Sequence, residues 1–419
     1  MPALQPARGT QDILPEAMRR HRAVIDTARA VAARYGYEEM ATPIFEFTEI
    51  FKRPIGEHTD IVSKEMYTFE DRGGEEVTLR PENTAGVVRA VISNGLTQSL
   101  PLKYLYAGPM FRYERPQKGR FRQFHQIGVE LIGAATPESD VETIALGADI
   151  LDALGVLGQC VLHLNTLGDT ESRLAYRAAL VDYYRGQRDG LSEDSRQRLE
   201  RNPLRILDSK DAGDIRINAA APDFERYLTD AARDFFAKVR AGLDALGIAY
   251  KLDPRLVRGL DYYCHSAFEF VTEALGAQGT VLGGGRYDGL MKLMDGPDAP
   301  AVGWAAGVER LALLIAEPPA PPRPIAVVPL GAVAEAKAMV IAHDLRGAGF
   351  TVDVAYIGNV SRRMKRANKV HAAAALIIGD DELARDAVTL RDLDSGEQVE
   401  VPLSQLRDRL APFRQGGGG

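Results

Sequence analysis

Residues 111–133 read FRYERPQKGRFRQFHQIGVELIG, two strand-like segments joined by a basic loop. Successive side chains of a strand point to opposite faces, so the second segment has an apolar face that packs and a polar face. Gln126 and Glu130 lie on the polar face, about 13 Å apart along the strand, with only Gly128 between them. Glycine inside a strand costs stability unless another group approaches the backbone, which favours a ligand on this face. The alternative is a half-exposed strand with solvent on its polar side.

The loop between the two segments is strongly basic. It has one acid, Glu114, and five bases: Arg112, Arg115, Lys118, Arg120 and Arg122. We expect such a loop to clamp a polyphosphate, with Phe121 or Phe124 stacked on a purine. The alternative is a solvated hairpin tip. The chain has 40 Arg and only 11 Lys, so a single arginine is a weak sign of phosphate contact.

The rest of the first 316 residues favours an antiparallel sheet flanked by helices. The expected strands are 103–113, 123–133, 266–271 and 280–282, and the expected helices are 16–35, 136–155 and 222–247. Strands that follow one another through hairpin-like loops indicate an α+β fold rather than a doubly wound one.

A second domain follows the segment EPPAPPRP, whose five prolines stop any helix. Beyond it, apolar strand patterns alternate with helical ones, which predicts a small α/β domain. The expected organisation is a domain over residues 1–320 with a helical insertion at about 169–222, a proline-rich linker at 317–324, an α/β domain over 325–411 and a disordered tail at 412–419.

Three further segments hold polar side chains beside glycines or a helix start. Glu82 and Thr84 precede an expected helix, where Glu82 either binds an ammonium group or only stabilises the helix start. The run LGGGRYDGL at 282–290 fits no phosphate-loop or dinucleotide pattern, and its glycines are expected to let the backbone approach a flat ligand. Arg310, in GWAAGVERL, either reaches a phosphate or forms an exposed ion pair on a helix.

Several classes of protein are excluded by composition. Net charge is −7, so phosphate-bearing partners must be bound by local patches. Seven histidines without metal-ligand spacing and two cysteines without a neighbouring base predict no metal site and no covalent nucleophile. No apolar run approaches the ~20 residues of a membrane span, and no signal peptide is visible, so we expect a cytoplasmic protein without membrane contact. Arginine, glutamate and glycine-lined strands suit phosphoryl or nucleotidyl transfer.

Taken together, these segments resemble the histidyl-tRNA synthetase family of class II aminoacyl-tRNA synthetases. RGTQDILP at 8–15 is similar to the family's opening signature, and residues 36–82 resemble motif 1, with Pro43 at its proline. Residues 111–133 resemble motif 2 and GWAAGVERL resembles motif 3. RGLDYY and GGGRYDGL resemble segments peculiar to the histidine enzymes. Asn83 departs from the glycine that is common in the family.

The resemblance implies ATP-dependent attachment of L-histidine to tRNA(His) through histidyl-adenylate. The implied histidine-binding residues are Glu82, Thr84, Gln126, Glu130, Arg258, Tyr262, Tyr263 and Tyr287. Glu82 and Thr84 would hold the α-amino group, and Glu130 and Tyr263 the two imidazole nitrogens. A neutral imidazole has one donor and one acceptor, so a carboxylate opposite a hydroxyl is a sensible discriminator.

For the nucleotide and tRNA, the resemblance implies a second set of contacts. The implied ATP-binding residues are Arg112, Glu114, Arg120, Phe124 and Arg310, with Phe124 on adenine and Mg²⁺ bound with ATP. Arg258 and Arg112 would be catalytic, through charge at the reacting phosphate. Arg115 and Gln117 would approach the tRNA acceptor end. A homodimer paired through the motif 1 region and an anticodon-binding C-terminal domain are also implied. The alternative is a catalytically inactive, histidine-binding regulatory paralogue of ATP phosphoribosyltransferase; such paralogues generally lack the C-terminal domain.

Overall fold

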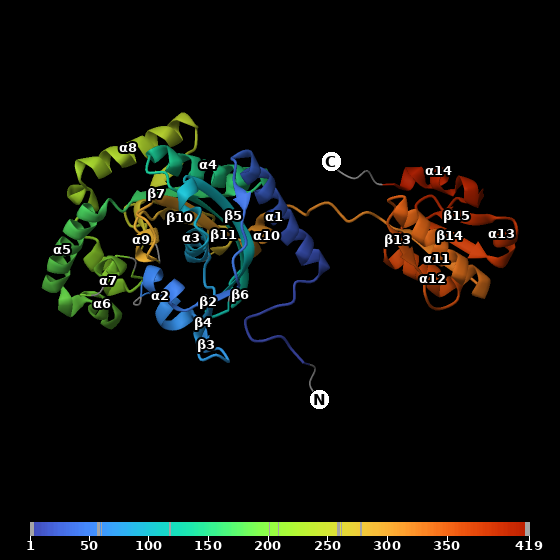
Figure 1. The fold of residues 1–419 in the computed structure, drawn as a ribbon, viewed down its shortest axis with the longest axis horizontal. Helices are drawn as coiled ribbons and strands as arrows, with labels where there is room; N and C mark the ends of the chain where they lie inside the picture. The colour runs from blue at the N-terminus through green and yellow to red at the C-terminus, as the bar shows by residue number, and fades with distance from the viewer. Residues whose placement is uncertain are drawn as a thin grey trace. The chain divides into compact units, whose positions relative to one another are not determined.

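The computed structural model describes residues 4–56, 59, 61–116, 119–200, 202–207, 209–257, 260, 262–276 and 279–414. The chain forms two compact units that divide after Pro318, inside the proline-rich stretch (Figure 1). Each unit has its own sheet and its own hydrophobic core. Among the described residues, no helix is long and apolar enough to cross a membrane.

The first unit is built on an eight-stranded sheet in the order β1-β5-β6-β11-β10-β9-β7-β8. The strands are β1 (Glu38–Glu39), β5 (Leu102–Phe111), β6 (Gln123–Ile132), β7 (Val161–Thr166), β8 (Tyr250–Leu252), β9 (Cys264–Val271), β10 (Thr280–Arg286) and β11 (Ala301–Gly307). Only the pairs at the two edges, β1 with β5 and β7 with β8, are parallel. The expected antiparallel sheet is therefore confirmed for the six central strands.

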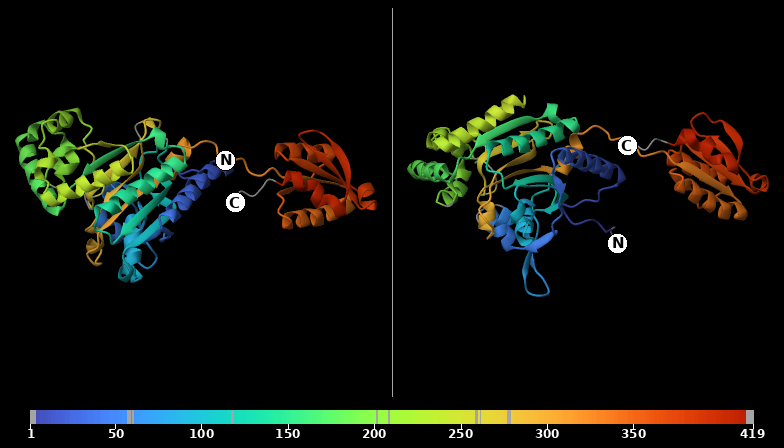
Figure 2. Two further views of the ribbon diagram at one scale, coloured as in Figure 1. Left: turned by 90° about the horizontal axis from the view of Figure 1, so that it is seen from above. Right: turned by 45° about the horizontal axis from the view of Figure 1, so that its top comes forward.

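Helices cover both faces of this sheet. One face packs against α1 (Pro15–Arg34), α4 (Pro137–Ala153), α8 (Asp230–Ala245) and α10 (Val308–Leu314). Of these, α8, α4 and α1 lie side by side (Figure 2). The other face packs against α3 (Thr84–Ser93) and α9 (Leu290–Leu293). Beside α3 lie α2 (Glu49–Ile55) and a small sheet of β2 (Phe45–Phe47), β4 (Glu76–Leu79) and β3 (Tyr67–Glu70).

The expectation of one helix over 222–247 is wrong. A short 3₁₀ turn at Phe224–Tyr227 is followed by extended backbone at Leu228 and Thr229, and α8 begins only at Asp230. The Thr229 hydroxyl accepts the Ala232 amide at 3.1 Å and donates to Asp169. A capping hydroxyl held from outside the helix therefore separates the two segments.

Between β7 and α8 lies a cluster of helices with a core of its own, formed by α5 (Thr170–Gly186), α6 (Glu193–Arg198) and α7 (Ala212–Asn218). The buried Asp214 carboxylate of α7 joins that helix to the start of α6 and to the preceding loop. It accepts hydrogen bonds from the hydroxyls of Ser192, Ser195 and Ser209 at 2.6–2.7 Å.

The second unit has a five-stranded sheet in the order β13-β12-β14-β15-β16, parallel in β13-β12-β14 and antiparallel thereafter. Its elements are β12 (Ile325–Leu330), α11 (Ala332–Gly347), β13 (Val352–Val354), α12 (Val360–Lys369), β14 (Ala374–Gly379), α13 (Asp380–Ala384), β15 (Ala387–Asp392), β16 (Gln398–Pro402) and α14 (Leu406–Leu410). The expected tail begins too early, because Phe413 packs against the core and Arg414 bonds to the Ala348 carbonyl. Residues 415–419 lie outside the described chain.

Candidate active site

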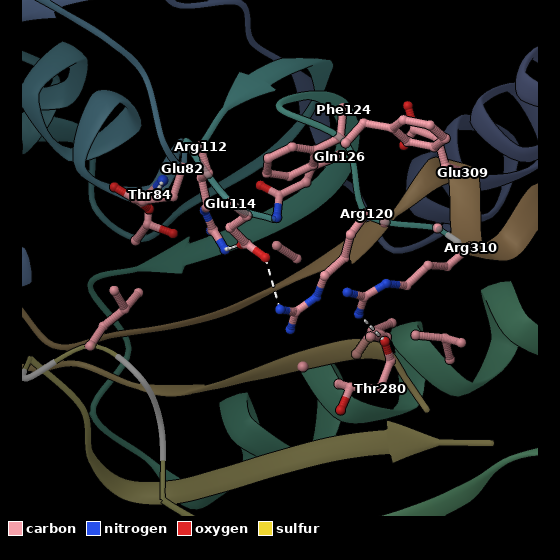
Figure 3. Close-up of a pocket in the computed structure, with 18 of the residues that line it drawn as sticks. Glu82, Thr84, Arg112, Glu114, Arg120, Phe124, Gln126, Thr280, Glu309 and Arg310 are labelled. Carbon is pink, nitrogen blue, oxygen red and sulfur yellow. Dashed lines mark hydrogen bonds and ion pairs between the residues drawn. The ribbon is translucent and has the colours of Figure 1, made fainter. Parts of the chain in front are cut away.

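A cavity of about 190 Å³ lies over the central strands of the first unit (Figure 3). Its lining comes from the start of α3, both segments of the basic hairpin, β10, β11 and the start of α10. Segments separated by more than 200 residues in the sequence therefore meet here. Glu82 and Thr84 lie at one end, and Arg310 and Thr280 lie at the other (Figure 3).

The first end of the cavity is formed by the start of α3. The Glu82 carboxylate accepts the backbone amides of Thr84 at 2.7 Å and Ala85 at 3.0 Å, so it stabilises the helix start as well as facing the cavity. Burial raises the pKa of Glu82, and the two amides oppose that shift. Sequence reasoning treated a ligand contact and a structural role as alternatives, and this geometry allows both.

Glu130 lies beneath this end, fully buried, and does not itself line the cavity. The Thr84 hydroxyl donates to its Oε1 at 2.7 Å, and the Tyr287 hydroxyl donates to its Oε2. Burial raises the pKa of Glu130 to about 8, although both hydroxyl bonds favour the charged form. Tyr287 is also buried and outside the lining. Neither residue therefore lies at the cavity surface. Glu130 reaches it through its hydrogen bond to Thr84, and Tyr287 is bonded to Glu130.

Apart from Glu114 Oε2 and Arg120 Nε, which belong to one ion pair, three buried polar atoms along the cavity make no well-aligned hydrogen bond with a described residue. They are Gln126 Oε1, Tyr106 Oη and Tyr262 Oη. Buried polar atoms are almost always paired in folded proteins, so three such atoms in one cavity indicate a polar ligand. Tyr263 also lines the cavity, with its ring centroid 4.6 Å from that of Tyr262.

The space above Gly128 is filled by protein, which corrects one expectation. A Cβ at Gly128 would clash with the Tyr106 ring from the neighbouring strand. The polar face of β6 therefore has a side chain between Gln126 and Glu130, and the glycine makes room for Tyr106 rather than for a ligand. Sequence alternation within one strand gives no sign of a side chain that comes from another.

The three consecutive glycines at 283–285 also differ in what their missing side chains make room for. Gly283 lines the cavity as expected. A Cβ at Gly284 would clash with the backbone of Gly303, and one at Gly285 would lie 2.9 Å from the Tyr263 ring. Only one of the three glycines therefore opens the sheet to a ligand, and the other two allow close packing.

The second end of the cavity is rich in arginine. Arg112, Arg120 and Arg310 line it. Glu114 lies between the first two, 2.8 Å from Arg120 and 3.9 Å from Arg112. Arg310 donates to the Thr280 carbonyl at 2.5 Å, so it does not form the exposed helical ion pair considered as an alternative. Three arginines against the carboxylates of Glu114 and Glu309 leave this end positive, as an anion site requires.

Phe124 lies between the two ends, and the Arg112 guanidinium is 5.3 Å from its ring centroid. Phe121 also lines the cavity, so both aromatic candidates of the hairpin are present. Arg115 is exposed and lies outside the lining. Arg258 and Gln117, named from the resemblance, lie outside the described residues.

Sequence reasoning missed a fully buried ion pair behind the site. Arg286 of β10 donates to Asp140 at 2.9 Å through Nε, to Asp288 at 2.9 Å and to Ser139 at 2.6 Å. Arg286 is the last residue of β10 and directly precedes Tyr287, so the ion pair with Asp140 anchors the backbone next to the tyrosine that donates to Glu130. The residues are 146 positions apart, and no spacing rule connects them.

Comparison with known proteins gives matches over the whole chain. A family model described as histidyl-tRNA synthetase matches residues 9–311, and an anticodon binding domain model matches residues 324–411. The chain belongs to the histidyl-tRNA synthetase family. It is 60% identical to histidine–tRNA ligase of Rhodospirillum rubrum over 99% of this chain and 100% of that protein. It is 57% identical to the ligase of Gluconacetobacter diazotrophicus over 98% and 99%.

The fold agrees with this family assignment. Apo histidyl-tRNA synthetase of S. aureus superposes with a TM-score of 0.83 at 35% identity, covering 99% of this chain and 100% of that chain. The predicted combination of an α+β first domain with a C-terminal α/β anticodon-binding domain is therefore confirmed. The cavity lies within the segment that matches the synthetase model.

Proposed function

We propose that this chain is a class II histidine–tRNA ligase. It joins L-histidine to the AMP part of ATP, forming histidyl-adenylate and releasing pyrophosphate, and then transfers the histidyl group to tRNA(His). The observation that carries the proposal is the polarity of one cavity. Carboxylates, hydroxyls and unpaired buried polar atoms lie at one end, and three arginines lie at the other. The first end suits the ammonium group and polar side chain of an amino acid, and the second suits the negative charge of a polyphosphate.

At the first end, the α-ammonium group of histidine is assigned to Glu82 and Thr84, with Gln126 bridging toward the carboxylate. The Thr84 hydroxyl donates its hydrogen to Glu130, so its oxygen lone pairs remain available to accept from an ammonium N–H. Glu130 and Tyr263 are assigned to the two imidazole nitrogens, with Tyr287 holding Glu130 in place. Tyr262 completes the lining on this side.

At the second end, Phe124 is assigned to the adenine ring, and Arg112, Arg120 and Arg310 to the phosphates, with Glu114 orienting Arg120. ATP is bound with Mg²⁺ in this proposal. The carboxylates of the described lining are engaged, Glu82 by two amides, Glu114 by arginine and Glu309 by His125. That arrangement fits a metal ion held by the phosphates themselves rather than by protein ligands.

The chemistry then needs positioning and charge neutralisation rather than a protein nucleophile. A carboxylate oxygen of histidine attacks the α-phosphorus, and the bond to the β-phosphate oxygen breaks to release pyrophosphate. Arg112, together with Arg258, is assigned to the negative charge that develops at the α-phosphate. A terminal ribose hydroxyl of tRNA then attacks the histidyl carbonyl, and AMP leaves.

The tRNA contacts are assigned to both units. The second unit is assigned to the anticodon, and Arg115 and Gln117 of the hairpin loop are assigned to the acceptor end. The helical cluster of α5 to α7 is a further candidate surface for tRNA. We place the enzyme in the cytoplasm, where its tRNA substrate is found.

We further propose a homodimer that pairs through the motif 1 region. Exposed apolar side chains gather on and beside the small sheet, namely Ile44, Phe45, Phe47 and Phe69. A contiguous apolar patch of this kind is typical of an interface. Light scattering at micromolar concentration tests this directly, since the mass of one chain is 45.7 kDa. A mass near that value would contradict the proposal, and Phe47→Glu should produce it from a dimeric parent.

Histidine-dependent exchange of pyrophosphate into ATP tests the main proposal, with other amino acids as controls. An active ligase shows exchange that requires histidine, followed by charging of tRNA(His). A regulatory paralogue binds histidine and shows neither activity. The match of an anticodon binding domain to residues 324–411 supports the ligase, because such paralogues generally lack that domain.

A further inference from the structure

The backbone amide of His125 lies where β11 stops supporting β6. Pairing between the two strands ends with Gln126 opposite Gly307. The next amide toward the hairpin loop, that of His125, donates to both carboxylate oxygens of Glu309 at 3.0 and 2.9 Å. Glu309 lies in α10, which directly follows β11. A side chain thus takes the place of the missing strand carbonyl and extends the ladder by one residue.

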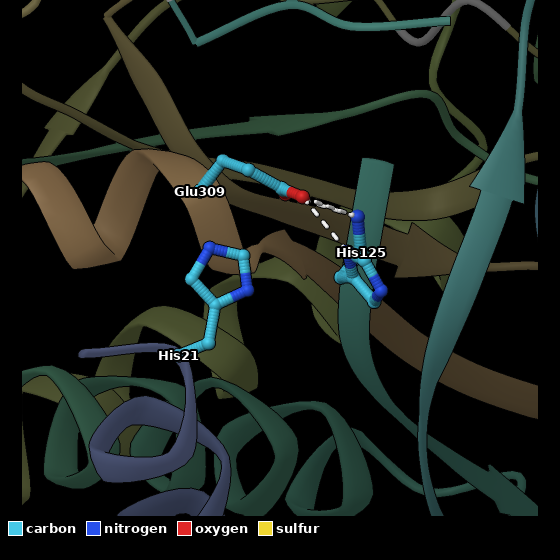
Figure 4. A group of neighbouring side chains, drawn as sticks. All are labelled: His21, His125 and Glu309. Atoms are coloured by element: carbon cyan, nitrogen blue, oxygen red, sulfur yellow. Dashed lines mark hydrogen bonds and ion pairs between the residues drawn. The ribbon is translucent and has the colours of Figure 1, made fainter. Parts of the chain in front are cut away.

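On its other side β6 stays paired with β5 through this stretch, with His125 opposite Pro109 and Phe124 opposite Met110, so Glu309 supports only the edge that β11 leaves. The ring of His125 adds a contact to the same carboxylate, with Nδ1 2.9 Å from Glu309 Oε1 (Figure 4). Glu309 therefore holds both the backbone and the side chain of His125.

His21 of α1 closes the group from the other side (Figure 4). Its ring meets that of His125 edge-on, with centroids 5.6 Å apart and planes at 77°. Burial lowers the pKa of His21, although the Glu309 charge opposes the shift, so a neutral imidazole covers the carboxylate. The cover excludes water that would compete for the His125 amide.

Two imidazoles and a carboxylate are also a ligand set for zinc. The three nearest ligand atoms lie within 4.8 Å of one another, whereas a tetrahedral zinc with bonds of about 2.1 Å separates its ligand atoms by about 3.4 Å. Glu309 is already engaged by the amide and ring of His125. These contacts favour a hydrogen-bonded role over a metal site.

We propose that Glu309 is a positioning residue for ATP. By holding the His125 amide it fixes, on the side that β11 leaves open, the backbone that presents Phe124, the residue assigned to adenine, two positions beyond the end of the β6–β11 ladder. Gln126, assigned to histidine, is held by that ladder without Glu309. Loss of the carboxylate should therefore raise the KM for ATP more than the KM for histidine. This inference rests on the function proposed above.

The test compares Glu309→Met with Glu309→Gln in histidine-dependent pyrophosphate exchange. Methionine has nearly the length of glutamate but no oxygen, whereas glutamine keeps one acceptor for the amide. We expect the KM for ATP to rise about tenfold in the Met variant and less than about threefold in the Gln variant, with the KM for histidine changed by less than about threefold in both. Glu39→Gln, which alters the exposed pair with Arg29, is the matched control and should change neither constant.

Equal rises in the two KM values, or an ATP KM unchanged in the Met variant, would overturn the positioning role. Loss of exchange from the wild type on chelation, restored by zinc alone, would overturn it in favour of a metal site. If the Met variant does not fold, Glu309→Asp, which withdraws the carboxylate by one methylene, should show the same selective loss of ATP affinity. Wild-type protein without histidine-dependent exchange would instead contradict the proposed function, so the two failures are distinguishable.

Discussion

The Tyr287 hydroxyl donates a hydrogen bond to Oε2 of Glu130, 157 residues earlier in the chain. The other carboxylate oxygen receives the Thr84 hydroxyl. Both oxygens of a fully buried carboxylate are thus held before any substrate arrives. Preorganisation of this kind spares the cost of reorienting polar groups when a ligand binds.

The first prediction concerns substrate selectivity. Glu130→Gln should raise the KM for histidine about tenfold or more and the KM for ATP much less, because the variant replaces one of the two carboxyl oxygens at the histidine end with an amide NH2. Steady-state pyrophosphate exchange with each substrate varied in turn measures both constants. Tyr287→Phe removes only one donor to the same carboxylate and should give a smaller effect of the same selectivity. Equal rises for both substrates would show that Glu130 is structural.

The second prediction concerns stability and pH. The folded protein raises the pKa of Glu130 to about 8, mainly through burial, from an ordinary value near 4.5. Between those values the unfolded chain has lost the proton that the folded chain keeps, so the free energy of unfolding falls as pH rises. For this one group the slope approaches about 1.4 kcal/mol per pH unit, and it levels off above pH 8.

Urea unfolding of the wild type and Glu130→Gln at a series of pH values isolates this effect. Glutamine cannot ionise, so the difference in unfolding free energy, wild type minus variant, should decrease from pH 5 to pH 8. Parallel curves would mean that Glu130 titrates near its ordinary pKa in the fold.

The third prediction concerns the buried pair of Arg286 and Asp140. Neither side chain is exposed to solvent. Asp140→Asn leaves a buried guanidinium without its main partner and should lower the free energy of unfolding by about 3–5 kcal/mol. The exposed pair of Arg29 and Glu39 provides the comparison, since Glu39→Gln should cost less than about 1 kcal/mol. Similar losses in the two variants, measured by urea unfolding, would be contrary to this view of the pair.

The fourth prediction concerns α12, which has five bases: Arg362, Arg363, Lys365, Arg366 and Lys369. Arg363 is buried and paired with Glu335 at 2.6 Å, and Arg366 is paired with Asp353 at 2.7 Å. The remaining bases, Arg362, Lys365 and Lys369, have no ion pair among the described residues. These three are therefore the ones expected to meet RNA phosphates.

Replacing Arg362, Lys365 or Lys369 singly with Gln should weaken tRNA binding and lower the slope of log K against log salt by ~0.7 per contact. Arg366→Gln should leave that slope unchanged, because its guanidinium already neutralises Asp353. Filter binding across a salt series distinguishes the two groups. If all four variants kept the wild-type slope, α12 would not be part of the tRNA-binding surface.

Sequence reasoning predicted the elements that local patterns determine. The alternation in β6 predicted its packing face and Gln126, and the helix start was predicted at Thr84; both Gln126 and Thr84 line the cavity, whereas Glu130 lies beneath it. Sequence reasoning failed where a distant side chain decides the outcome. Tyr106 fills the space above Gly128, Asp140 pairs with Arg286, and Glu309 holds the amide of His125. None of these contacts follows from spacing within one segment.

The environment of Glu130 has a consequence for how such a pocket can change over evolution. A Cβ at Gly303 of the adjacent strand would clash with Glu130 Oε2, so the carboxylate occupies the volume that a neighbour's side chain would need. Any residue larger than glycine at 303 displaces the group assigned to imidazole. Selecting another amino acid thus requires coordinated changes at Glu130, Gly303 and Tyr287, and each single step alone leaves a clash or an unpaired hydroxyl.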